Sequence, residues 1–155
     1  SSLMEATQTV VDIYSRFLFE SEVVDTRADH SMSVDELKDA MLRAQDASYG
    51  DGLDKDVRHP YMWACKSHYY SSGLNFYNFP YAFGGLFARG LYAKYAQEGA
   101  SFVPIYKKLL HTTTVATAED AAKVAGIDLT DKEFWLSALA EVEEKIDMFC
   151  ALVEM

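Results

Sequence analysis

The chain has 155 residues, half of them apolar, and a formal net charge of −10 at pH 7. This length suits one compact domain that can bury a sizeable core. The acidic balance argues against nucleic-acid binding, which needs Lys and Arg against the phosphates. We find no signal-peptide pattern and no run of about 18 apolar residues, so we expect no membrane span. The two cysteines stand far apart, which favours free thiols and a cytoplasmic location.

The first third of the chain predicts two helices. Apolar residues recur at helical spacing over 3–24, which indicates one long amphipathic helix. Ser33 and Glu36 then form a capping box, in which each side chain satisfies a free backbone N–H group. The helix that follows is expected to run to about Tyr49 and to end at Gly50.

The middle of the chain combines an aromatic block with an apolar helix. A turn-rich loop leads to Pro60, which suits the first position of a helix. Residues 79–97 predict an apolar, buried helix that contains Gly84, Gly85 and Gly90. Each glycine costs about 1 kcal/mol of helix propensity, so we expect another backbone to pack closely against them.

Three further helices are predicted in the last third. Ser101 can cap a helix over 101–110, and Thr117 another over 117–124. Thr130 and Glu133 resemble a second capping box, which would open a final helix to about residue 153. No segment alternates long enough to predict a sheet. The expected fold is therefore all-α, a bundle of about seven helices in a single domain over 1–155.

The sequence contains no complete motif for catalysis. The four histidines are His30, His59, His68 and His111, and no two have the three-to-five-residue spacing of a helical zinc pair. Phosphate-binding loops and Ser-nucleophile elbows are also missing. The carboxylates lie on amphipathic helices and predict solvated faces. We therefore expect no metal site within this chain.

The aromatic block stands out because a buried Tyr needs a partner for its hydroxyl group. Tyrosines, phenylalanines and His68 crowd together between His59 and Gly84. From residue chemistry alone, both a structural aromatic cluster and a wet binding groove remain open, and the cluster is favoured.

The aromatic block contains His59-Pro60-Tyr61-Met62-Trp63-Ala64 with His68-Tyr69-Tyr70, then Phe76-Tyr77-Asn78-Phe79-Pro80-Tyr81-Ala82-Phe83-Gly84, and it is followed by Gly90-Leu91-Tyr92-Ala93. Later in the chain come Gly126-Ile127-Asp128-Leu129 and Glu133-Phe134-Trp135. Together these stretches resemble the C-terminal part of oligoendopeptidase F-type zinc metallopeptidases, relatives of thimet oligopeptidase. The resemblance runs in order over most of the chain.

The resemblance implies a helical clamshell enzyme with a deep channel, in which a His-Glu-x-x-His helix and a downstream Glu hold zinc. Nothing in the 155 residues matches that motif, so the chain is expected to be the C-terminal fragment of a larger catalytic domain. The zinc ligands of the full-length parent would lie in an upstream segment of the same protein. No cofactor is expected in the isolated chain.

The same resemblance implies roles for residues on the wall opposite the metal. His68 and Tyr81 match the residues that face the zinc and stabilise the oxyanion, and Tyr77 is a second donor candidate. His68, Tyr77 and Tyr70 would bind the backbone of short peptide substrates. A phenol stays protonated at neutral pH, so it can donate to developing negative charge.

The resulting hypothesis is that the chain is the C-terminal portion of a zinc oligopeptidase that cleaves internal bonds of short peptides. In that enzyme the chain would form the substrate groove and stabilise the oxyanion. Alone, the chain would be inactive. The alternatives are a free-standing helical module that binds peptides without catalysis and a purely structural bundle.

Overall fold

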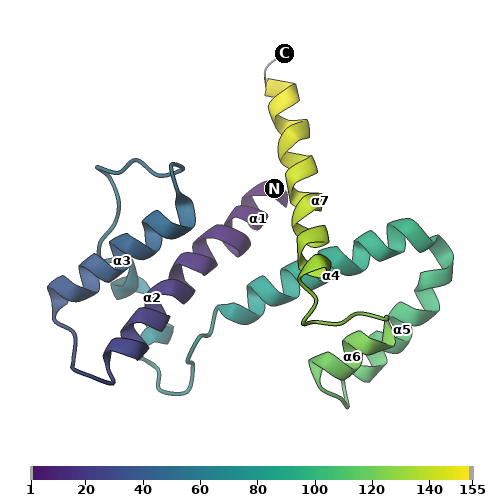
Figure 1. The fold of residues 1–155 in the computed structure, drawn as a ribbon, viewed down its shortest axis with the longest axis horizontal. Coiled ribbons are helices and arrows are strands. Elements are labelled where there is room, and N and C mark those ends of the chain that lie inside the picture. Colours follow the sequence, from purple (N-terminus) through teal and green to yellow (C-terminus); the bar gives the residue numbers. More distant parts are fainter. Residues whose placement is uncertain (1, 154–155) are drawn as a thin grey trace. The chain divides into compact units, whose positions relative to one another are not determined.

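The computed structural model describes residues 2–153, and helices make up its regular structure (Figure 1). The chain divides into two compact units, Ser1–Phe83 and Gly84–Met155, each with its own core. No strand occurs among the described residues, so the predicted all-α class is confirmed. The single domain over 1–155 stays a prediction.

The first unit begins with one long helical rod. α1 (Ser2–Thr7), a π-helical turn (Gln8–Asp12) and α2 (Ile13–Thr26) follow one another without a break, as the periodicity over 3–24 predicts. Such π turns insert one extra residue per turn into a helix and occur often at functional sites. Asp12, which ends this turn, is part of the cluster described below.

A second helix, α3 (Val34–Tyr49), packs beside α2 (Figure 1). The predicted capping box is confirmed: the Ser33 hydroxyl accepts from the Glu36 N–H at 3.3 Å, and the Glu36 carboxylate accepts from the Ser33 N–H at 2.7 Å. Gly50 ends the helix with a φ of 58°, a left-handed conformation that glycine adopts without strain.

The aromatic block does not form the α-helix that Pro60 predicts. It forms two short 3₁₀ turns, Met62–Cys65 and Ser67–Tyr70. Trp63 and Tyr69 both pack on the core around Phe19 and Met41. Residues six apart are offset by about 120° around a regular α-helix. Two separate turns therefore allow both rings to reach the same core.

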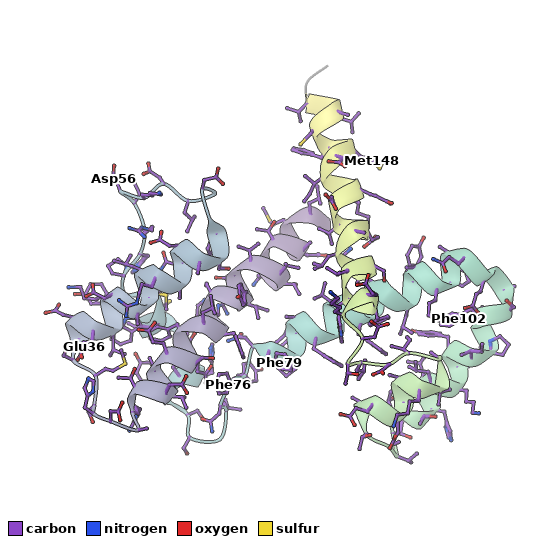
Figure 2. All side chains as sticks on the ribbon, viewed as in Figure 1. Glu36, Asp56, Phe76, Phe79, Phe102 and Met148 are labelled. Atoms are coloured by element: carbon purple, nitrogen blue, oxygen red, sulfur yellow. The ribbon has the colours of Figure 1, made fainter. Side chains whose placement is uncertain are left out.

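α4 (Phe79–Glu98) begins in the first unit and continues into the second. A 3₁₀ turn (Gly99–Ser101), α5 (Phe102–Thr112), α6 (Ala118–Val124) and α7 (Lys132–Val153) complete the chain. Figure 2 marks Phe102, which is almost fully buried, at the start of α5, and Met148, which is exposed, on α7. None of the helices over residues 2–153 has both the length and the apolar character needed to cross a bilayer.

The helix caps of the second unit agree only in part with the sequence. Thr117 caps α6 as predicted, accepting from the Asp120 N–H at 3.2 Å. The second capping box at Thr130 is wrong, because that hydroxyl donates to Asp128 at 2.7 Å within the preceding turn. Asp131 instead accepts from the Glu133 N–H at 3.0 Å. Ser101 likewise donates its hydroxyl to the Glu98 carbonyl instead of capping α5.

The expectation of a buried α4 is also wrong for most of the helix. Among its described residues only Gly90 and Leu91 are fully buried. A Cβ atom on Gly90 would lie 2.4 Å from the Phe134 ring, so a close approach exists there, although a side chain makes it and not a backbone. A Cβ atom on Gly84 would meet nothing within 4 Å. The two glycines therefore have different structural roles.

Candidate functional site

His68 is held in place by its neighbour Tyr69. The Tyr69 ring packs edge-on against Phe19 at 5.4 Å, and its hydroxyl lies 3.5 Å from the Arg16 carbonyl. Burial raises the pKa of Tyr69, with a further contribution from the Glu20 carboxylate. Because Tyr69 anchors the 3₁₀ turn on α2, the position of the adjacent imidazole is fixed as well.

The His68 ring lies between two tyrosines and an amide. Its centroid is 4.6 Å from that of Tyr69 and 5.5 Å from that of Tyr77. Its Nε2 atom is 2.7 Å from the Asn78 side-chain nitrogen. Burial, followed by the positive charge of Arg16, lowers the pKa of His68. The imidazole is therefore neutral at pH 7.

Behind Asn78 lies a charge cluster between the first helical rod and α3. Arg16 donates from Nη1 to the Asn78 side-chain oxygen at 3.2 Å and from Nη2 to Asp12. The Tyr49 hydroxyl donates to the other oxygen of Asp12 at 3.1 Å. Burial, and secondly the Asp12 charge, raises the pKa of Tyr49 to about 12. The side chains of Arg16 and Asp12 are only 11% and 17% exposed, so this pair is well shielded from solvent.

Tyr77, in the turn before α4, and Tyr81, in the first turn of that helix, form a pair of phenols. Their hydroxyl oxygens are 3.0 Å apart and their ring centroids 5.7 Å apart. Pro80 is tolerated in this first turn, where its missing N–H group is not needed. Both side chains are open to solvent, with exposed fractions of 41% and 56%.

The turn before α4 is strained at Phe76, which has a φ of 52°. This left-handed conformation costs a bulky residue about 1–3 kcal/mol. The Glu20 carboxylate accepts a hydrogen bond from the Phe76 N–H at 2.6 Å, and the Phe17 ring packs 5.6 Å from the Phe76 ring. Figure 2 shows Phe76 and Phe79 at this junction of loop and helix. The turn sets the positions of Tyr77 and Asn78 relative to His68.

Three of the four predicted site residues thus come together. His68 contacts Tyr77, and Tyr77 contacts Tyr81, although their catalytic roles stay predictions. Within the described chain, Tyr70 makes no hydrogen bond or ring contact with this group. It is 65% exposed and borders a different hollow, which Trp63 and Tyr69 also line.

Sequence reasoning missed the residues that support the site. Asp12 and Arg16 are four residues apart in a helix, and Asn78 is the one amide within a run of aromatic residues. These features could have marked them as candidates. Nothing in the sequence indicates that Arg16 reaches Asn78, 62 positions away, or that Phe76 has a positive φ.

The described residues do not fit a zinc site. No group of three or more His, Cys, Asp or Glu side chains between residues 2 and 153 could hold a metal ion. The imidazole closest to the tyrosine pair already has its Nε2 atom against Asn78.

Comparison with known proteins relates the chain to a peptidase. Oligopeptidase PepF of Bacillus subtilis (strain 168) is 31% identical over 99 residues, which are 64% of this chain and 14% of that protein. The matched region spans about a seventh of the length of this relative. No family model and no solved structure matches the chain.

Proposed function

We propose that this chain forms one wall of the substrate channel of a longer, zinc-dependent oligopeptidase that hydrolyses internal bonds of short peptides. The observation that carries the proposal is the exposed pair of phenols, Tyr77 and Tyr81, next to the imidazole of His68. The similarity to oligopeptidase PepF supports it. The free cysteines, Cys65 and Cys150, fit a cytoplasmic enzyme.

The phenol pair suits hydrogen-bond donation to a substrate. Two hydroxyl groups carry two protons, and the bond between Tyr77 and Tyr81 uses only one of them. The hydrogen bond from Tyr77 raises the pKa of Tyr81, so this phenol is protonated at neutral pH. One O–H group therefore remains to donate to a peptide carbonyl or to the oxyanion that develops from it. His68 would add a second donor close by.

In this function the chain binds and orients the peptide substrate but does not bind the metal. Since the described residues cannot hold zinc, the metal ligands and the residue that activates water would come from an upstream segment of the longer protein. Tyr77, Tyr81 and His68 would hold the substrate backbone opposite that segment. Tyr70, on its separate hollow, is proposed to contact a more distant part of the peptide.

Substitution of Tyr81 by Phe tests this function in the longer peptidase. Removal of one oriented donor to an oxyanion typically lowers kcat by about 10²- to 10³-fold. We expect a loss of this size with little change in KM, measured on a quenched fluorescent peptide. Tyr92→Phe is the control, because Tyr92 lies on the same helix and is 60% exposed, against 56% for Tyr81.

The control variant should keep the kcat of the unaltered enzyme. Equal rates for the Tyr81→Phe and Tyr92→Phe variants would contradict the proposal. Retained peptide affinity without any cleavage by the longer protein would instead support a peptide-binding module that has no catalytic role.

A further inference from the structure

The partly buried amide of Asn78 has only one chemically sensible orientation. Arg16 can only donate hydrogen bonds, since a guanidinium group has no acceptor. Its Nη1 atom lies 3.2 Å from Asn78, and Asp12 fixes the guanidinium by accepting from Nη2. The Asn78 atom that faces Arg16 must therefore be the oxygen. The opposite orientation would place two donors against each other.

With its oxygen turned to Arg16, Asn78 presents its NH₂ group to His68. The Asn78 nitrogen is 2.7 Å from His68 Nε2, which is a short hydrogen-bond distance. Because the amide donates, Nε2 has to accept, and it can do so only when it carries no proton. A neutral imidazole then carries its single proton on Nδ1.

The charges around the ring agree with a neutral imidazole. Arg16 on α2 and Lys66 next to the turn oppose a positive charge on His68, and burial acts in the same direction. Glu20 on α2 opposes this effect, but its carboxylate already accepts from the Phe76 N–H. Burial and the two cations outweigh it, so the pKa of His68 is lowered.

We infer that Asp12, Arg16 and Asn78 form a positioning chain that keeps His68 in the Nδ1–H tautomer and so makes Nδ1 a donor for a peptide carbonyl group. The described residues provide no hydrogen-bond partner for Nδ1 of His68, whereas Nε2 accepts a hydrogen bond from the Asn78 side chain. Asn78 is a positioning residue, because it acts through the imidazole. The donation from Nδ1 to a peptide carbonyl rests on the proposed function. The tautomer of His68 is independent of that function.

Nitrogen NMR of the 155-residue chain tests the tautomer without any substrate. Long-range ¹H–¹⁵N correlation of labelled histidines distinguishes the protonated ring nitrogen from the unprotonated one. We expect Nδ1 of His68 to be protonated and Nε2 to be unprotonated at pH 7. Detection of the proton on Nε2, or of a doubly protonated ring, would overturn the inference, and this measurement needs no variant.

The Asn78→Asp variant provides a second test, in which the opposite tautomer of His68 is expected. The carboxylate has the same shape and retains the contact with Arg16, but it can only accept. It should move the His68 proton to Nε2 and raise the pH at which the ring titrates. Asp is also a favourable residue immediately before a helix, so α4 should be preserved. His30, which pairs with Glu36 at 2.8 Å far from Asn78 in the sequence, serves as the internal control.

The peptidase assay separates this inference from the proposed function. In the longer enzyme, Asn78→Asp should lower kcat by up to about 10²-fold, as expected for one misdirected donor. An Nδ1–H tautomer together with full activity of Tyr81→Phe would overturn the proposed function alone. An Nε2–H tautomer together with an inactive Tyr81→Phe variant would overturn this inference alone.

Discussion

At the scale of single residues, the site depends on contacts between groups that are distant in the sequence. Arg16 and Asn78 are separated by 62 positions, and Tyr49 and Asp12 by 37. Each contact pairs a polar group that would otherwise be costly to shield from water. The neutral state of His68 follows from this arrangement, because a partly buried imidazole next to a guanidinium group resists protonation.

The lowered pKa of His68 predicts a pH-dependent stability. The unfolded chain binds a proton near pH 6.5, whereas the folded chain does so only at lower pH. The contribution of His68 to stability is therefore fully present above about pH 6.5 and is lost as the pH falls toward the folded pKa. We expect urea unfolding between pH 5 and 7.5, a range from about one and a half units below that value to about one unit above it, to show a shallower pH dependence for His68→Gln. Identical slopes for variant and parent would disprove this linkage.

At the scale of helices, local signals in the sequence identify ends better than interiors. The capping box of Ser33 and Glu36 and the stop at Gly50 depend on neighbouring backbone groups, and both could be predicted. The Thr130 box failed because Asp128 competes for the same hydroxyl. The 3₁₀ turns of the aromatic block were missed because packing of Trp63 and other rings on the core decides them.

Two glycines of α4 provide a matched test of helix packing. Gly84→Ala adds a methyl group in open space, so better helix propensity should stabilise the chain by up to about 1 kcal/mol. Gly90→Ala forces a methyl group against the Phe134 ring, which itself packs on Phe87 at 5.7 Å and on Trp135 at 5.1 Å. Overpacking of this kind costs about 1–3 kcal/mol.

Urea unfolding of both alanine variants measures the difference. We expect the midpoint to rise for Gly84→Ala and to fall for Gly90→Ala, although the chemical change is the same. A rise in the urea midpoint of both variants would contradict the predicted overpacking at Gly90. It would mean that the Phe134 ring moves aside at no cost in stability.

At the scale of the whole molecule, the sequence predicts the class of fold and the segment that contains the candidate site. It does not predict which residues of that segment contact one another. The density of Tyr and His between His59 and Gly84 marks the segment in which His68, Tyr77 and Tyr81 lie together. That His68, Tyr77 and Tyr81 meet there depends on the strained turn at Phe76, which no local pattern indicates.

The isolated 155-residue chain should not cleave peptides. Its described residues offer no cluster of ligands for zinc, and the proposed function assigns the activation of water to a segment outside this chain. We expect metal analysis of the purified chain to find no stoichiometric zinc and a peptide assay to find no turnover. Stoichiometric zinc accompanied by turnover would show that the chain contains a complete site.

The kcat of the proposed longer peptidase, carrying both Tyr77→Phe and Tyr81→Phe, tests the central claim most directly. The two hydroxyls are bonded at 3.0 Å, so they act as a unit and their effects should not simply add. We predict that the double variant loses at least about 10²-fold in kcat but less than the product of the two single losses. An unaltered kcat in the double variant would contradict the assignment of this tyrosine pair to the reaction.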